Sequence, residues 1–227
     1  MLTHTQDPVH WDKLVSKQIG VWQVQRQPGR DRHYEALAGP WAKLVVVFSR
    51  QHGAGGDDVA HALGEALQWP VFDREIVEYI AQTAHVRSQI IESFDERKQS
   101  EIDNWIKTLL SSGSLAIDQY LKHLVHVLVS LAEHGQAILI GRGSPFVVKS
   151  VHAVRVLVTA PLQQRALRLA QKRGISNREA LALIQKVDGE RLAFARRYFH
   201  RDPNDCELYD LVLNTEHLSP PHASNVI

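Results

Sequence analysis

The chain has 227 residues, of which 44% are hydrophobic and 22% are charged, and this composition suits one soluble α/β domain with a small appendage. The net charge of +1 excludes a strong overall field, so we expect no nucleic-acid partner without a local basic patch. Cys206 is the only cysteine, and no run of about 18 apolar residues occurs. We therefore expect a cytoplasmic protein without an internal disulfide and without a membrane partner.

An amphipathic arm is expected over residues 1–40. Large apolar side chains recur there at helical spacing, namely Trp11, Leu14, Val15, Ile19 and Trp22. A polar loop containing Pro28 and Gly29 then interrupts the pattern. We expect the arm to pack on its own domain or on a partner subunit, because its polar face is not basic enough to favour a membrane surface. Residues 41–227 would form the main domain.

Strands and helices alternate through the main domain. Five apolar segments predict strands: "KLVVVFS", "WPVFD", "QAILIGRG", "AVRVLVTA" and "YDLVLNT". The helical segments between them imply an α/β fold with a mostly parallel sheet, helices on both faces, and ligands beyond the carboxyl ends of the strands. The unbroken apolar run at residues 44–48 is typical of a strand buried on both faces. We predict that this strand is central and parallel to those at 137–140 and 154–159.

The predicted helices differ in composition. A charged helical stretch at 88–112 lies in an insertion that spans about residues 85–115. The next helix is apolar almost all round, which favours a central position in the domain or the contact of a homodimer. Its core stripe consists of Ile117, Leu121, Leu124, Leu128 and Leu131. Pro161 suits the first turn of a helix that ends at Arg173, and a long charged helix follows at 177–199.

A glycine-rich loop follows the first strand of the main domain, in the stretch "VVVFSRQHGAGGDDVAHALGEAL" (residues 45–67). A strand that runs through glycines into a helix presents backbone N–H groups and a positive helix end to a phosphate. The usual phosphate-loop pattern is not met, because Gly56 and Asp57 occupy the positions of the lysine and the hydroxyl residue. A tight structural turn therefore stays open as the alternative to a nucleotide site.

Three ordered segments carry a family resemblance: "FSRQHGAGGDDVAHALGEALQWPVFDREIV", "ILIGRGSPFVV" and "VDGERLAFARRYFHRDPNDCELYDLVLNT". Together they resemble the cytidylate kinase-like family over residues 44 to about 218. The resemblance implies a P-loop-type parallel sheet flanked by helices, with a helical insertion and an arginine-rich lid at about residues 165–205. Family members typically carry glycine in place of the phosphate-loop lysine, as Gly56 does here, and then a basic residue where this chain has Asp57.

The same resemblance implies roles for residues in the matching motifs. Donor phosphates would be bound by Ser49, Arg50, Gly53, Ala54, Gly55 and Gly56. The acceptor would be bound by Asp73, Arg74 and Arg142, and the catalytic lid arginines would be Arg191, Arg197 and Arg201. Asp73 is equally suited to cap the helix that begins at Arg74, and lid arginines could instead pair with the neighbouring carboxylates Asp188, Glu190 and Asp202. The implied cofactor is Mg²⁺ with ATP, and no metal site made by the protein alone is expected.

The implied reaction is transfer of the ATP γ-phosphoryl group to a nucleoside monophosphate, CMP by resemblance, so the expected partners are small-molecule nucleotides. Lid arginines would stabilise the charge of the transferred group and help to exclude water. One alternative is a regulator that binds nucleotides without turnover, and another is an oligomeric interaction protein with a vestigial loop. Asp57 suggests the regulator, since its carboxylate would repel a bound phosphate. On that hypothesis, Asp57→Arg should tighten the binding of Mg·ATP.

Overall fold

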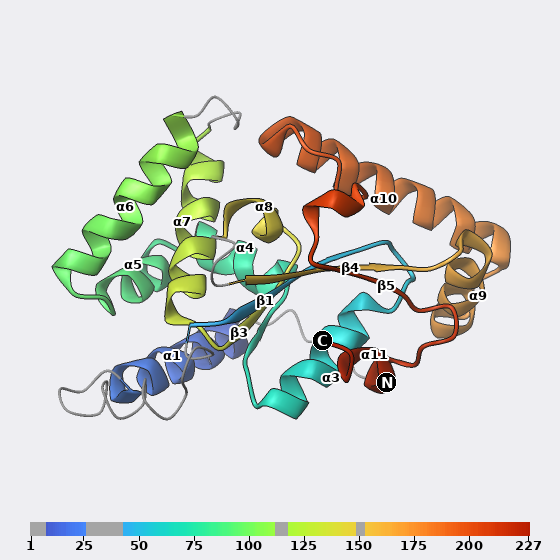
Figure 1. Cartoon of the computed structure of the whole chain (residues 1–227), viewed down its shortest axis with the longest axis horizontal. Coiled ribbons are helices and arrows are strands. Elements are labelled where there is room, and N and C mark those ends of the chain that lie inside the picture. The colour runs from blue at the N-terminus through green and yellow to red at the C-terminus, as the bar shows by residue number, and fades with distance from the viewer. Residues whose placement is uncertain (1–7, 26–42, 112–117, 149–152) are drawn as a thin grey trace.

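A five-stranded parallel sheet forms the centre of the molecule. The computed structural model describes residues 8–25, 43–111, 118–148 and 153–227. The strand order is β2-β3-β1-β4-β5, and every neighbouring pair is parallel (Figure 1). The strands are β1 (Val45–Arg50), β2 (Val71–Phe72), β3 (Ala137–Ile140), β4 (Ala153–Thr159) and β5 (Leu211–Asn214). The predicted α/β sheet of about five strands is confirmed, as is the central position of β1 between β3 and β4.

The side chains of β1 contribute to two hydrophobic cores, because successive residues of a strand point to opposite faces. Val45 and Val47 belong to one buried cluster, whereas Val46 and Phe48 belong to the other. Helices α3 (Gly56–Leu67) and α11 (Pro220–Ser224) cover one face of the sheet (Figure 1). The opposite face is covered by α4 (Arg74–Gln82), α7 (Gln119–His134) and α8 (Ser144–Val147). The apolar run of β1 is therefore what a strand between two helical layers requires.

Helix α7 lies in the middle of the larger core. Asp118 caps it by accepting a hydrogen bond from the backbone N–H of Leu121 at 2.8 Å. Of the two positions that its apolar perimeter suggested, the structure shows the central one. Beside it stand α5 (Ala84–Glu92) and α6 (Glu96–Ser111), where the sequence predicted one helical stretch at 88–112. The stretch divides because Asp95 starts a new helix, accepting a hydrogen bond from the N–H of Lys98 at 2.7 Å.

The N-terminal arm contains helix α1 (Pro8–Gln25), which packs on the domain itself. Val15, Ile19 and Trp22 are buried in the larger core. The Trp22 ring stacks on the His134 ring, with centroids 3.8 Å apart and 4° between the planes. The structure thus shows packing on the same domain, and the rest of the predicted arm at 1–40 lies outside the described residues. Within the described ranges, no helix is long and apolar enough to cross a membrane.

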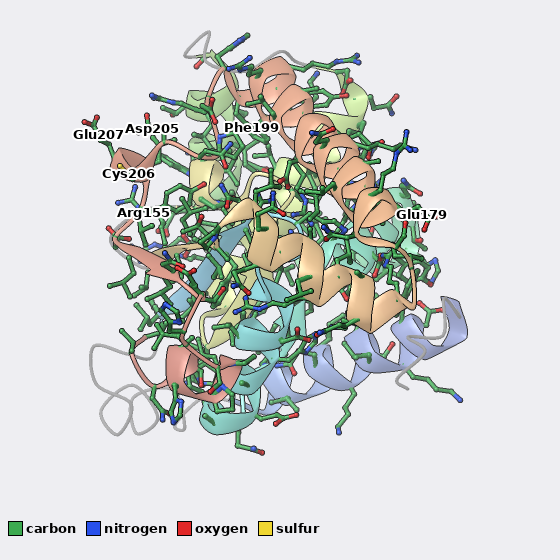
Figure 2. All side chains as sticks on the ribbon, turned by 90° about the vertical axis from the view of Figure 1, so that its right-hand side faces the viewer. Arg155, Glu179, Phe199, Asp205, Cys206 and Glu207 are labelled. Atoms are coloured by element: carbon green, nitrogen blue, oxygen red, sulfur yellow. The ribbon has the colours of Figure 1, made fainter. Side chains whose placement is uncertain are left out.

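Helices α9 (Leu162–Arg173) and α10 (Asn177–Phe199) form the segment that the sequence predicted as a lid. They pack on each other around a small core of their own, made of Ala166, Leu169, Ala180 and Ile184. Figure 2 shows the two helices on one side of the molecule, with Glu179 near the start of α10 and Phe199 at its end. Pro161 is the N-cap of α9, so it lies one position before the first turn in which the sequence placed it.

Candidate functional site

The glycine loop joins β1 to α3 in a conformation that needs its glycines. Gly53 and Gly55 have φ angles of +80° and +78°, which residues with a side chain rarely adopt. A Cβ atom on Gly53 would stand 2.8 Å from the carbonyl oxygen of Arg165, and one on Gly56 would stand 2.5 Å from Cβ of Arg50. The loop is therefore a tight turn with close backbone approaches, and its surroundings must decide whether it is also a binding site.

A cavity of about 200 Å³ opens at the carboxyl ends of β1 and β3, next to the start of this loop. Its walls come from the end of β1, the start of α4, the segment after β3, helix α10 and the segment before β5. The charged residues in its lining are Arg50, Arg74, Arg142, Asp188, Glu190 and Arg191. The lining thus contains four arginines and two acidic residues, and this net positive charge suits an anionic ligand.

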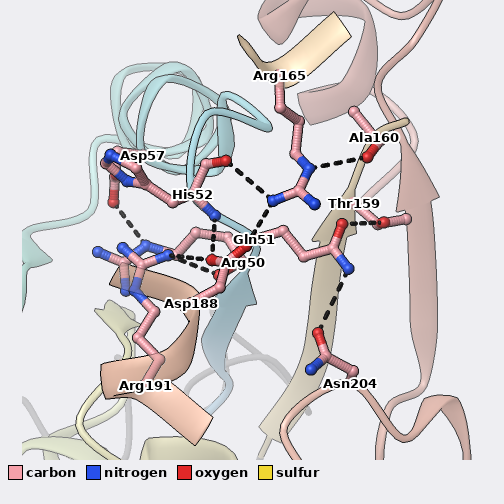
Figure 3. A network of polar contacts seen from close by, with 10 residues as sticks. All are labelled: Arg50, Gln51, His52, Asp57, Thr159, Ala160, Arg165, Asp188, Arg191 and Asn204. Atoms are coloured by element: carbon pink, nitrogen blue, oxygen red, sulfur yellow. Dashed lines mark hydrogen bonds and ion pairs between the residues drawn. The ribbon is translucent and has the colours of Figure 1, made fainter. Parts of the chain in front are cut away.

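Arg50 and Arg191 both line this cavity, and their side chains lie close together (Figure 3). Nη1 of Arg191 donates a hydrogen bond to the backbone carbonyl oxygen of Arg50 at 2.8 Å. Burial lowers the pKa of Arg191 to about 10, and the charge of Arg50 contributes to the shift. Burial also lowers the pKa of His52, again with a contribution from the Arg191 charge. An anion between the guanidinium groups would relieve this repulsion.

Asp188 ties helix α10 to the start of the glycine loop. Its carboxylate accepts hydrogen bonds from the backbone N–H of His52 at 2.8 Å and from Nη1 of Arg165 at 2.5 Å (Figure 3). Nη1 of Arg191 lies 4.0 Å from the same carboxylate. The sequence offered Asp188 only as a pairing partner for arginines, and this pairing is confirmed. Its contact with the loop backbone was missed, because no local pattern in the sequence announces it.

Arg142 stands between two glycines after β3 and has a φ angle of +52°. Its guanidinium forms an ion pair with the carboxylate of Glu78 on α4, and it lies 4.9 Å from the centroid of the Phe194 ring. Nε of Arg74 is 3.4 Å from the same Glu78 carboxylate. Glu78 thus gathers both predicted acceptor-binding arginines at one wall of the cavity. Glu78 was not among the residues predicted from the sequence, although its spacing four residues after Arg74 was an available signal.

The third residue predicted to bind the acceptor, Asp73, is the N-cap of α4. Its side chain accepts a hydrogen bond from the backbone N–H of Ile76 at 3.0 Å. Asp73 is not among the residues that line the cavity. The structure therefore shows the capping role that the sequence had offered as an equal alternative.

The predicted lid arginines occupy different environments. Arg191 lines the cavity, whereas Arg197 and Arg201 are exposed and do not line it. The guanidinium of Arg197 instead lies 5.1 Å from the centroid of the Tyr198 ring. Of the three predicted catalytic arginines, only Arg191 therefore lines this cavity.

The segment between α10 and β5 reaches the cavity through different residues. Pro203 and Asn204 line it, and Nε2 of Gln51 lies 3.4 Å from Oδ1 of Asn204. The Tyr209 hydroxyl donates to the carbonyl oxygen of Pro203 at 2.8 Å, and burial raises the pKa of Tyr209 to about 12. Gln51 is also bound by the Thr159 hydroxyl at 2.6 Å. Neutral side chains therefore connect this segment to the loop (Figure 3).

Both acidic residues at the start of α3 have basic partners. Oδ1 of Asp57 lies 2.9 Å from Nε of Arg50, and Oδ1 of Asp58 lies 3.0 Å from Nζ of Lys172 on α9. The repulsion between Asp57 and a bound phosphate that the sequence suggested stays a prediction, and it did not take this pairing with Arg50 into account. Arg50 and Asp57 are seven positions apart in the sequence, on opposite sides of the glycine turn, so their spacing did not reveal the pair.

A second cavity adjoins the other end of the glycine loop. It is lined by Ala54 and Gly55 together with Arg168 and the segment that follows β5. The Thr215 hydroxyl donates to the carbonyl oxygen of Ala54 at 2.6 Å, and Nη1 of Arg168 donates to the same hydroxyl at 3.1 Å. Of the residues predicted to bind donor phosphates, Ser49 and Arg50 therefore line the first cavity, and Ala54 and Gly55 line the second.

Fold and site together define an α/β protein with a glycine loop and an arginine-lined cavity at the carboxyl edge of its parallel sheet. The sequence profile of the cytidylate kinase-like family matches residues 45–217, and the chain belongs to that family. The family resemblance that the motifs predicted is thereby confirmed.

Several known proteins are similar to this chain. A cytidylate kinase of Pyrobaculum aerophilum is 28% identical over 179 residues, which cover 78% of this chain and 86% of that protein. A cytidylate kinase of Methanopyrus kandleri is 32% identical over 105 residues, which cover 42% of this chain and 54% of that protein. The chain spans about half the length of the Methanopyrus protein and of three further cytidylate kinases that it matches. An uncharacterized protein from Eubacterium ventriosum has a similar fold, with a TM-score of 0.56 at 15% identity, covering 81% of this chain and 94% of that one.

Proposed function

We propose that the protein is a nucleotide kinase that transfers the γ-phosphoryl group of ATP to a nucleoside monophosphate, with CMP as the acceptor. The observation that carries the proposal is the convergence of arginines from four separate elements on one cavity beside the glycine loop. Guanidinium groups suit this reaction because they bind phosphate oxygens in a fixed geometry and stabilise the charge of the transferred group. Family membership and the cytidylate kinases among the relatives support CMP as the acceptor.

The two cavities suit a reaction between two nucleotides. We assign the cavity lined by Arg168 to the base of the donor, and the arginine-lined cavity to the acceptor and the transferred group. Arg142 and Arg74 would bind the acceptor phosphate, while Arg50 and Arg191 would act on the transferred group. Positioning and charge neutralisation would supply most of the catalysis, because phosphoryl transfer asks for little covalent chemistry from the protein.

The residues present fit ATP with Mg²⁺. Gly55 caps α3 without a side-chain hydrogen bond, so the N–H groups in the first turn of that helix suit the donor phosphates, with Arg50 beside them. Within the described ranges, no three or more His, Cys, Asp or Glu side chains converge on a metal position. Mg²⁺ would therefore be held mainly by phosphate oxygens and water, which is a common arrangement for this ion. When bound, it would neutralise part of the charge on the donor phosphates.

A regulator that binds nucleotides without turnover is the second candidate, and the exposed positions of Arg197 and Arg201 favour it. For turnover with three lid arginines, helices α9 and α10 would have to carry these two side chains from the surface to the cavity. The same movement would close the cavity and exclude water from the transferred group.

A coupled assay that detects ADP tests the proposal, with Mg·ATP and each of several nucleoside monophosphates. Turnover with CMP is the expected result, whereas turnover only with another monophosphate would change the acceptor. Thermal unfolding with and without Mg·ATP separates the alternatives, because a ligand at 100 times its Kd stabilises the folded state by about 2.7 kcal/mol. Stabilisation without turnover would favour the regulator, and neither effect would favour the interaction protein.

A further inference from the structure

Asp57 and Arg50 form an ion pair at the mouth of the glycine loop (Figure 3). Oδ1 of Asp57 lies 2.9 Å from Nε of Arg50. The arginine side chain is only 11% exposed, whereas the aspartate side chain is 54% exposed. Arg50 is therefore the more buried member of the pair, and Asp57 contacts it from the more exposed side.

Two glycines shape the channel in which the Arg50 side chain lies. A Cβ atom on Gly56 would stand 2.5 Å from Cβ of Arg50, and one on Gly141 would stand 2.6 Å from its Nη1. The side chain thus runs from the glycine loop toward the segment after β3, where Arg142 stands. Asp57 is bonded through Nε, which leaves the N–H groups of the two terminal nitrogens for other acceptors. The Arg50 side chain therefore lies between the glycine loop and the segment after β3, at the cavity that it lines.

Arg50 needs a partner to stay in this position. Its neighbour Arg191 carries the same charge, and the charge of Arg50 is one cause of the lowered pKa of Arg191. An arginine side chain also loses rotamer freedom when it is confined, which opposes a single fixed position. A carboxylate on Nε offsets both effects because it supplies an opposite charge and fixes the plane of the guanidinium.

We propose that Asp57 is a positioning residue that orients Arg50 toward the donor phosphates, in a loop where Gly56 replaces the usual lysine. The proposal rests on the proposed kinase function. It predicts that Asp57 strengthens the binding of ATP, whereas a simple repulsion between Asp57 and phosphate would weaken it. Removing the negative charge of Asp57 then weakens the binding of a polyanion, because Arg50 loses its orientation.

Calorimetric titration of ATP into four proteins tests whether loss of the Asp57 charge weakens or tightens ATP binding. They are the parent, Asp57→Asn, Arg50→Gln and the double variant, each measured with Mg²⁺ and with EDTA. We expect Asp57→Asn to weaken ATP binding about 3- to 10-fold, a modest effect because the pair is partly exposed to solvent. In the Arg50→Gln background the same substitution should have no effect or tighten binding slightly, since only repulsion is left. Asp57→Glu, which keeps the carboxylate, should retain most of the parent's affinity for ATP.

Glu65→Gln is the matched control, because it removes one exposed carboxylate from the same helix away from both cavities. Its ATP affinity should equal that of the parent, and thermal unfolding should show that every variant is folded. Tighter ATP binding by Asp57→Asn in the parent background would overturn the proposal in favour of repulsion. A loss seen only with Mg²⁺ would overturn it in favour of a metal ligand. If the parent itself binds no ATP, the kinase function fails. If the parent binds ATP and Asp57→Asn binds it equally well, only the positioning role fails.

Discussion

Replacing Arg142 by alanine tests the acceptor side of the cavity. Arg142 lines the cavity, pairs with Glu78 and has a φ angle of +52°. If its guanidinium binds the acceptor phosphate, the loss of one charge-assisted contact is worth about 1.5–3 kcal/mol. At about 1.4 kcal/mol for each factor of ten, the Kd for CMP should rise roughly 10- to 150-fold.

The stability of the Arg142→Ala variant should also fall, but by a smaller amount. The ion pair is mostly buried, with side chains of Arg142 and Glu78 that are 11% and 26% exposed. Glu78 keeps Arg74 as a second partner at 3.4 Å, so we expect a loss of about 1–2 kcal/mol in the free energy of unfolding. For a chain of this length each kcal/mol corresponds to roughly 2–4 °C in Tm.

Arg142→Gly provides the matched control. Glycine removes the same side chain but adopts a positive φ angle without strain, which relieves about 1 kcal/mol and offsets part of the lost stability. Calorimetric titration with CMP and thermal unfolding should therefore give equal affinity losses for the two variants, with a higher Tm for glycine. A Tm that falls while CMP affinity stays at the parent value would contradict this prediction and make Arg142 a structural residue. Affinities that follow the Tm values would refute it as well.

Three further predictions concern stability and motion. Trp22→Ala should lower the free energy of unfolding by about 3–5 kcal/mol, measured with denaturant, because the indole is buried and stacked on His134; an unchanged value would mean that the arm does not stabilise the domain. Hydrogen bonds from Arg155 lower the pKa of Asp210, so the ionised carboxylate stabilises the folded protein at neutral pH. This contribution is lost as the pH falls below about 4. Asp210→Asn should thus lower the Tm at pH 7 and have little effect near pH 2, and an equal loss at both values would contradict this. Residues 165–205 should show slower hydrogen exchange with nucleotide bound, and equally slow exchange without it would rule out a closing lid.

Features that depend on local conformational preference and on the apolar pattern could be predicted from the sequence. The run at 44–48 predicted a central strand, because β-branched residues on both faces need cover on both sides. The positive φ angles of Gly53 and Gly55 follow from a loop that only glycine forms without strain. The Asp73 cap was also predictable, since the capping residue and the helix it starts are neighbours in the chain.

Which charged side chains pair with each other depends on the folded chain. Arg142 and Glu78 are 64 residues apart in sequence, yet they pair because the segment after β3 and helix α4 border one cavity. Arg191 reaches that cavity while Arg197, on the same helix, does not line it. Long charged side chains have many rotamers of similar energy, so their partners depend on which charges the fold brings near. The family resemblance of the sequence therefore predicted an arginine-rich site, whereas only the folded chain showed that Asp57 pairs with Arg50.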